Sequence, residues 1–250
     1  MSSRAVNGGR GTADSGIDSD LVARAACALR AGQVVAIPTD TVYGLAAAVD
    51  RSEAIERLYA IKGRPDEKAI PVLISDAEHI ERLSPRLSMM AVRLARAFWP
   101  GALTLVLQGR LDLPSGVTDV TGDGLRTVAV RVPDNAMALA IIAAAGGALA
   151  VTSANRSGAA PAVEAREVAE FEFSHPVLVI DGGRAAGGVP STIVRTTGEH
   201  AEILREGAIP ASAIDAALAG FEAGSGDDDW ARYDLRMTNW GRNNASKATR

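Results

Sequence analysis

Apolar residues between positions 21 and 218 recur alternately at helical and at strand spacing. Helical spacing predicts helices at 21–31, 53–61, 86–99, 135–145, 164–170 and 210–218. Short apolar runs predict strands at 34–37, 71–74, 103–107, 127–132, 149–152 and 177–180. Residues 192–195 and 202–204 flank a Thr-Gly turn and are expected to pair as a hairpin. Helices interleaved with strands in this way predict one α/β domain built on a twisted, mixed β-sheet.

The two ends of the chain lack this pattern. Residues 1–20 are rich in Gly, Ser and Asp and predict a flexible arm, whereas residues 221–250 mix acidic and basic side chains and predict a flexible tail. The domain is therefore expected to span residues 21–220. The arm has no apolar core of the kind that a secretory signal carries, and no apolar run reaches the ~18 residues of a membrane span. These features predict a cytoplasmic protein that does not enter a membrane.

The amino-acid composition excludes several kinds of protein and of binding site. Hydrophobic residues make up 47% of the 250 residues, which is enough for a sizeable core, and the formal net charge is -4. That charge is not typical of a protein that holds nucleic acid by electrostatics alone. The single cysteine, Cys27, excludes an intramolecular disulfide and is expected to be buried in its helix. The three histidines are far apart in the sequence, which predicts surface or structural roles and no metal site.

The common phosphate-binding and nucleophile motifs are missing from the sequence. It contains no GxxxxGK loop ending in Ser or Thr, no GxGxxG after a strand, and no GxSxG elbow. An enzyme of this sequence that uses a nucleotide would hold the phosphates by other means.

Polar side chains follow two of the predicted strands directly. PTDTVYGL occupies residues 38–45, and Thr-Ser-Ala-Asn occupies residues 152–155. Ligands of α/β sheets usually bind at strand ends, so both segments are candidate binding loops. Both compositions also suit turns or helix caps in which the polar groups satisfy the local backbone.

Two groups of basic residues are further candidates. Lys62-Gly63-Arg64-Pro65 follows a predicted helix, and its cations could wrap a polyphosphate or complement the helix dipole. Arg131 ends an apolar strand, where a charge is costly unless it is paired, and this position indicates an anionic partner.

Seven segments in this order resemble one family: PTDTVYGL, KGRP, WPGALTLVL, VAVRVP, TSANRSG, PSTIV and ILREGAI. They resemble the YrdC/TsaC family of L-threonylcarbamoyladenylate synthases, in its short, single-domain form. The resemblance implies an open, twisted mixed sheet with flanking helices and a large concave cavity. It also implies a nucleotidyltransferase that converts L-threonine, bicarbonate and ATP into threonylcarbamoyl-AMP, pyrophosphate and water. A downstream transferase machinery would use this product for the threonylcarbamoyladenosine (t6A) modification of tRNA.

The resemblance also implies roles for particular residues. The family's KxR and SxN residues, which would be catalytic, fall on Lys62, Arg64, Ser153 and Asn155. The threonine contacts fall on Thr41, Arg131, Val151 and Ser191. The ATP contacts fall on Arg64, Lys68, Thr127, Ser153, Pro161 and Arg205. Mg²⁺ is expected to accompany ATP, and the resemblance implies no metal-binding residue of the protein itself.

One segment departs from the family's pattern. Residues 64–74 read RPDEKAIPVLI, where many relatives have RPxxNPLIVH. Lys68 stands in place of the asparagine, and the relatives' histidine, which contacts threonine, has no counterpart here.

Two other functions stay open at this point. A paralogue could act on a different carbamate or acyl group with the same residues. A non-catalytic module for RNA binding or ribosome maturation could instead contact tRNA through the concave face, and a steep salt dependence would mark such binding.

Overall fold

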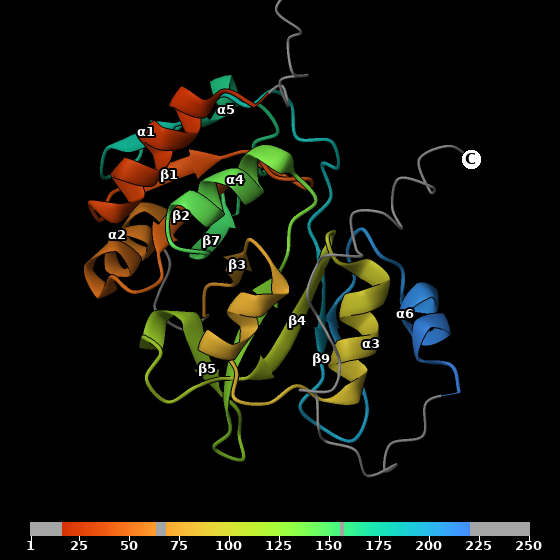
Figure 1. Cartoon of the computed structure of the whole chain (residues 1–250). Helices are drawn as coiled ribbons and strands as arrows, with labels where there is room; N and C mark the ends of the chain where they lie inside the picture. The colour runs from red at the N-terminus through yellow and green to blue at the C-terminus, as the bar shows by residue number, and fades with distance from the viewer. Residues whose placement is uncertain (1–16, 64–68, 156–157, 221–250) are drawn as a thin grey trace, which may run out of the picture.

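Strands and helices in the described residues form a ten-stranded mixed sheet with helices on both faces (Figure 1). The computed structural model describes residues 17–63, 69–155 and 158–220. The helices are α1 (Ser19–Arg30), α2 (Ser52–Lys62), η1 (Ala77–Arg82), α3 (Met89–Phe98), η2 (Ser115–Val117), α4 (Ala136–Ala144), α5 (Ala165–Ala169) and α6 (Ala211–Leu218), where η denotes a 3-10 helix. The strands are β1 (Val34–Ile37), β2 (Gly44–Ala48), β3 (Val72–Ile74), β4 (Leu103–Gln108), β5 (Thr118–Val120), β6 (Arg126–Arg131), β7 (Ala148–Ser153), β8 (Val177–Val179), β9 (Thr192–Arg195) and β10 (Glu202–Arg205). All the predicted helices and strands are confirmed, with ends shifted by at most three residues.

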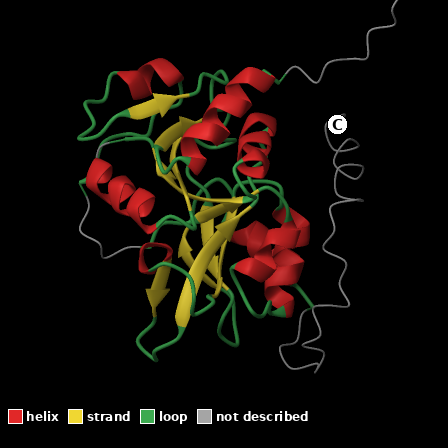
Figure 2. Cartoon of the chain, turned by 60° about the vertical axis from the view of Figure 1, so that its left-hand side comes forward, coloured by secondary structure: helices red, strands yellow, loops and turns green. Residues whose placement is uncertain are grey.

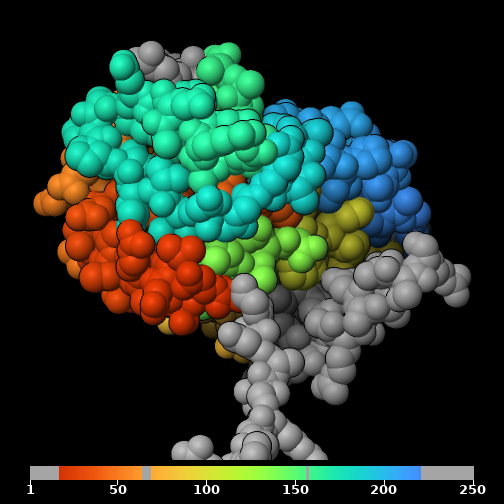
Figure 3. Space-filling model, turned by 90° about the horizontal axis from the view of Figure 1, so that it is seen from above, coloured from red at the N-terminus to blue at the C-terminus, as the bar shows by residue number. Residues whose placement is uncertain are grey.

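The strands lie in the order β10-β9-β4-β6-β3-β7-β2-β1-β8, and β5 pairs with β6 beside this path. The pairs β1–β8, β3–β6 and β4–β9 are parallel, and the other pairs are antiparallel. The predicted mixed sheet and the β9–β10 hairpin are therefore confirmed, and Figure 2 shows the strands twisting between the helices. Seen from above, residues 151–200 lie against the N-terminal elements, as the β1–β8 pairing requires (Figure 3).

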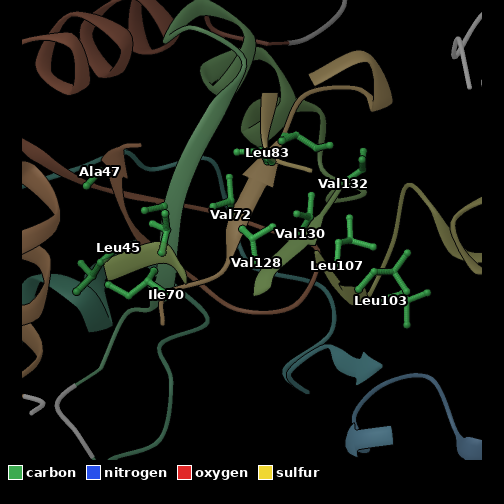
Figure 4. Close-up of a cluster of buried hydrophobic side chains, with 14 of the residues drawn as sticks. Leu45, Ala47, Ile70, Val72, Leu83, Leu103, Leu107, Val128, Val130 and Val132 are labelled. Carbon is green, nitrogen blue, oxygen red and sulfur yellow. The ribbon is translucent and has the colours of Figure 1, made fainter. Parts of the chain in front are cut away.

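Different helices cover the two faces of the sheet. Helices α1 and α4 lie side by side on one face and bury their apolar residues against β1, β2, β3 and β7. Helices α2 and α3 pack on the opposite face, against the larger cluster of buried side chains. Figure 4 shows part of this cluster, which runs from Leu45 through Val72 to Val130 and Leu107.

Helices α1 and α4 cover one face of the sheet only as far as β3. On the strands beyond β3, which are β6, β4 and β9, the same face of the sheet carries polar side chains. Leu73 of β3 belongs to the α1/α4 cluster and pairs with Arg131 of β6. Since side chains alternate along a strand, Val130 points into the large cluster and Arg131 onto this face. Leu105 pairs with Val130, so its neighbour Thr104 lies next to Arg131. The fold thus sets polar groups beside the helix pair α1/α4.

Strand β2 has no counterpart among the sequence predictions. Its residues, Gly-Leu-Ala-Ala-Ala, include no β-branched side chain, and all five are buried, so no alternation marks them as a strand. Gly44 pairs with Ile37, so residues 38–43 of PTDTVYGL connect β1 and β2 as a hairpin loop, and Gly44 and Leu45 begin β2.

The prediction that Cys27 is buried is wrong, because the residue is exposed. Helix α1 buries Ala25, Ala26, Ala28 and Leu29 against the sheet, and Cys27 lies on the face of the helix turned to solvent.

Asn135 caps the helix that borders the polar strands, and its replacement gives a measurable prediction. Its Oδ1 accepts a hydrogen bond from Ala138 N at 2.9 Å. We expect Asn135→Ala to lower the free energy of unfolding by about 1 kcal/mol, because an orphan donor at the helix start loses its acceptor. Urea unfolding measures this loss. Asn135→Asp keeps the acceptor and serves as the control, and equal losses in both variants would contradict the capping role.

Candidate functional site

Arg131 ends β6 and points its guanidinium group at the loop that follows β1. Its Nη2 forms an ion pair with Asp40 Oδ1 at 2.5 Å, and its Nη1 donates to Thr41 Oγ1 at 3.0 Å. Its Nε donates to Gly101 O at 2.8 Å. The side chain of Arg131 is 7% exposed and that of Asp40 is 13% exposed. A buried charge needs such a partner. Asp40 is therefore an anionic partner of the kind that is expected from the position of Arg131 at the end of an apolar strand.

Two hydroxyl groups lie beside Arg131 on the neighbouring strands. Thr104 Oγ1 of β4 and Ser191 Oγ, just before β9, are 2.8 Å apart and share a hydrogen bond. Both residues are buried. Arg205 of β10 donates from Nη2 to Ser191 O at 2.7 Å and so ties this end of β9 to the last strand. We name the following five residues the Arg131 cluster: Asp40, Thr41, Thr104, Arg131 and Ser191.

Local hydrogen bonds fix the loop that carries Asp40 and Thr41. Thr39 Oγ1 donates to Val42 O at 2.6 Å and accepts from Thr41 N at 3.2 Å, which is a turn of the kind expected for this composition. Gly188 N donates to Thr41 O at 2.7 Å. A Cβ at Gly187 would lie 2.7 Å from Asp40 O, so glycine is required for this close approach.

Lys62 ends α2 and is enclosed by oxygen atoms from the end of β7. Its Nζ donates to Asn155 Oδ1 at 2.6 Å, to Ser153 O at 2.8 Å and to Asn155 O at 2.9 Å. Ser153 Oγ also donates to Asn155 Oδ1, at 2.7 Å. Lys62 is 3% exposed and Asn155 is 7% exposed. We name these three residues the Lys62 cluster, in which the end of α2 meets the end of β7.

The two clusters share one loop. Ala154 N, between Ser153 and Asn155, donates to Tyr43 O at 2.7 Å, and Tyr43 N donates to Ala162 O at 2.8 Å. Tyr43 therefore connects the Lys62 cluster to Thr41, which is two residues away. A change in one cluster can displace the other through this short segment.

The other predicted site residues lie at varying distances from the clusters. Thr127 and Arg131 share one face of β6, four residues apart, which is about 13 Å along a strand. Val151 lies inside β7 with its side chain in the α1/α4 cluster of apolar residues, and its N–H donates to Pro71 O. Pro161 precedes Ala162, which donates to Ala154 O. Arg64 and Lys68 lie outside the described residues.

Two residues of the Arg131 cluster are absent from the sequence-predicted site. Asp40 stands inside the PTDTVYGL motif, and the expectation of an anion near Arg131 was the available signal for it. Thr104 follows the apolar start of β4 and resembles any strand threonine in the sequence. Only the pairing of β4 with β6 and β9 reveals its place beside Arg131 and Ser191.

Burial and neighbouring charges shift the pKa values of two groups at this site. Burial lowers the pKa of the Arg131 guanidinium, and the charge of Asp40 opposes that effect. Partial burial and the charge of Asp40 raise the pKa of the Asp134 carboxyl group, which follows β6. The carboxyl groups of Asp40 and Asp134 therefore influence each other, and Arg131 pairs with Asp40.

Within the described segments, no group of three or more His, Cys, Asp or Glu side chains could hold a metal ion. The same segments contain no helix long and apolar enough to cross a membrane. A cleft of about 770 Å³ opens elsewhere, lined by Pro85, Gln108, Gly109, Arg110, Leu111, Asp112, Val120, Gly124, Leu125 and Arg126. It contains none of the predicted site residues, so the large concave cavity around the site stays a prediction.

Known proteins resemble the chain over most of its length. A threonylcarbamoyl-AMP synthase of Bacillus subtilis is 36% identical over 83% of this chain and 59% of that protein. A putative threonylcarbamoyl-AMP synthase of Mycobacterium tuberculosis is 37% identical over 79% of this chain and 88% of that protein. The crystal structure of P. abyssi Sua5 complexed with L-threonine superposes with a TM-score of 0.74 at 36% identity. The match covers 80% of this chain and 58% of that one.

The chain spans less than two thirds of the B. subtilis and P. abyssi proteins. The family model Sua5_yciO_yrdC, described as telomere recombination, matches residues 27–207. That range includes every residue of the Arg131 and Lys62 clusters. The chain belongs to the Sua5/YciO/YrdC family.

Proposed function

We propose that this protein is a nucleotidyltransferase that makes threonylcarbamoyl-AMP from L-threonine, bicarbonate and ATP, with release of pyrophosphate and water. The observation that carries the proposal is the Arg131 cluster, in which a buried guanidinium lies beside hydroxyl groups from three parts of the sheet. Relatives named threonylcarbamoyl-AMP synthase and a relative solved with L-threonine support it.

The Arg131 cluster suits the polar ends of threonine. An arginine fork pairs well with a carboxylate, so Arg131 would bind the carboxylate of the amino acid. The hydroxyls of Thr41, Thr104 and Ser191 can each donate or accept, so they suit the threonine side-chain hydroxyl. The carbonyl group of Val151 could add a backbone contact.

The Lys62 cluster suits the nucleotide. Lys62 holds Ser153 and Asn155 in place through their carbonyl oxygens and the Asn155 side chain, and its ammonium adds positive charge near the reacting groups. Arg64, Lys68 and Arg205 would add further charge for the phosphates, and Thr127 and Pro161 would contact the rest of the nucleotide. We expect Mg²⁺ to arrive bound to the phosphate oxygens of ATP.

The chemistry needs charge neutralisation more than a protein nucleophile. The threonine amine attacks the carbon of bicarbonate and gives a carbamate and water. A carbamate oxygen then attacks the α-phosphorus of ATP, and pyrophosphate leaves. Two anions must meet in the second step, so fixed positive groups such as Lys62 and Arg64 stabilise the transition state.

The product's mixed anhydride is reactive, and its use fits a transferase that modifies tRNA. We propose that a separate t6A transferase machinery consumes threonylcarbamoyl-AMP and that the reaction takes place in the cytoplasm. Direct contact of this protein with tRNA is not needed for the reaction.

Pyrophosphate release from ATP tests the proposed function. We expect release only when L-threonine and bicarbonate are both present, together with a nucleotide product of the mass of threonylcarbamoyl-AMP. Omission of each substrate in turn is the control, and Asp112→Asn, which removes an exposed carboxylate outside both clusters, should react like the wild type. No release with all three substrates, or release that ignores threonine, would overturn the proposal.

A further inference from the structure

The Asp40 carboxylate and the Arg131 guanidinium, which lie side by side, both have hydrogen-bonding capacity that the described residues do not use. Its Oδ1 pairs with Arg131, and its Oδ2 has no hydrogen-bond partner among the described residues. In the described segments, the buried side-chain polar atom that lacks a hydrogen-bond partner is Arg195 Nε. Asp40 Oδ2 also lacks a partner but is not such a buried atom, so it is open to solvent. A carboxylate can accept about four hydrogen bonds, so one face of Asp40 is open to a donor.

Arg131 has two matching donors. A guanidinium has five N–H bonds, and Arg131 uses one each on Nε, Nη1 and Nη2. The second N–H of Nη1 and that of Nη2 have no partner in the described segments. An accepting anion and a donating cation therefore stand side by side, and each has hydrogen-bonding capacity for one more group of opposite charge.

The neighbouring backbone acceptors are already engaged. The carbonyl oxygens of Thr41, Val42, Gly101 and Ser191 accept hydrogen bonds from Gly188 N, Thr39 Oγ1, Arg131 Nε and Arg205 Nη2, respectively. Within the Arg131 cluster, Asp40 is the residue that carries a negative charge. Asp40 is paired with Arg131 through Oδ1 alone, so its Oδ2 is the anionic acceptor available to a cationic group of the ligand.

We propose that Asp40 binds the α-ammonium group of the amino-acid substrate through Oδ2, while Arg131 binds its α-carboxylate. The inference rests on the proposed function and assigns a substrate-contacting role to a residue that the sequence analysis did not place in the site. An α-amino acid carries both charged groups on the same carbon atom, so a single molecule can satisfy the pair. The site would then reject hydroxy acids and amines that lack one of the two charges.

Binding of two ligands by wild-type protein and by Asp40→Asn tests this role. The ligands are L-threonine and 3-hydroxybutanoate, which is threonine without its amino group. The asparagine can still accept from Arg131 but has no charge for an ammonium group. We expect the variant to bind L-threonine at least ~10-fold more weakly, as for one lost hydrogen bond to a charged group, and to bind 3-hydroxybutanoate within ~3-fold of wild type. Ligand-detected NMR titration of the full chain measures both constants.

Two further variants complete the experiment. Asp112→Asn removes a carboxylate that pairs with Arg110 on the exposed surface, and it should change neither constant. Asp40→Glu keeps the carboxylate and should keep the preference for threonine, which tests the proposal even where Asp40→Asn does not fold.

Each outcome decides one question. Equal weakening of both ligands by Asp40→Asn would show a structural role and overturn the inference, as would unchanged threonine binding. Equal affinity of the wild type for the two ligands would overturn it without any variant. Failure of the wild type to bind L-threonine at all would overturn the proposed function together with this inference, which distinguishes the two failures.

Discussion

Lys62→Met is expected to lower turnover by at least ~100-fold, the scale of one lost charged donor in an active site. Methionine has a similar length and keeps the apolar contacts of the stem, but it removes the ammonium group. Asn155 O then loses the Lys62 donor in a buried position, while Ser153 O and Asn155 Oδ1 keep only the hydrogen bonds from Asn155 N and Ser153 Oγ. The end of β7 would no longer be held against α2.

The same variant is expected to be less stable. A buried acceptor left without a donor costs on the order of 1–3 kcal/mol, so we expect a loss of roughly that size in the free energy of unfolding. Urea unfolding and pyrophosphate release measure the two effects. Glu56→Gln, an exposed change on the same helix, is the control and should stay within about 0.5 kcal/mol, as is typical at the surface. A Lys62→Met protein with wild-type turnover and stability would contradict the role assigned to this ammonium group.

Arg131→Met is expected to reduce kcat/KM for L-threonine by about 10²–10³-fold, with the KM for ATP nearly unchanged. Loss of one partner in a buried, hydrogen-bonded charge pair costs roughly 2–5 kcal/mol, and 1.4 kcal/mol is a factor of ten. The methionine cannot bind a carboxylate and leaves Asp40 without its cation. Steady-state kinetics with each substrate varied in turn separates the two effects. Equal increases in both KM values would instead indicate a general collapse of the site.

A double variant identifies the cause of the accompanying stability loss. Removal of one partner from a buried ion pair costs about 3–5 kcal/mol, chiefly because a charge stays buried alone. Arg131→Met should therefore be strongly destabilised, and Arg131→Met/Asp40→Asn should recover part of the loss. A double variant no more stable than Arg131→Met would assign the loss to the contacts with Thr41 and Gly101 instead.

Local sequence patterns determine most of the helices and strands here. Strands such as β4 and β9 have apolar alternation or β-branched residues, and helices such as α1 end at glycine, so both kinds of element are predictable. Strand β2 is not, because an alanine-rich segment buried on both faces resembles a helix as much as a strand. Cys27 was assigned to the wrong face because composition alone does not give the rotation of a helix.

The sequence predicts the candidate site only in part, because some of its residues are brought together by long-range strand pairing. Arg131 is predictable because a charge at the end of an apolar strand is unusual, Lys62 because it belongs to a basic group after a helix, and TSAN because its polar residues follow a strand; the family resemblance then implies their roles. Thr104 was missed because its role depends on strand order, which brings β4 between β6 and β9. Asp40 was seen as part of a motif, but its partner is 91 residues away, and local patterns carry no information on such pairs.

The strand order also constrains how the chain is made. Strand β4 pairs on one side with β6, which follows soon after, and on the other side with β9, which is synthesised more than eighty residues later. At about 5–20 residues per second, a ribosome would leave that edge of β4 unpaired for roughly 4–16 s. An open strand edge among leucines favours pairing with other chains. The nascent protein should therefore depend on chaperones until Ser191 and β9 have emerged, which is also the moment at which the Arg131 cluster becomes complete.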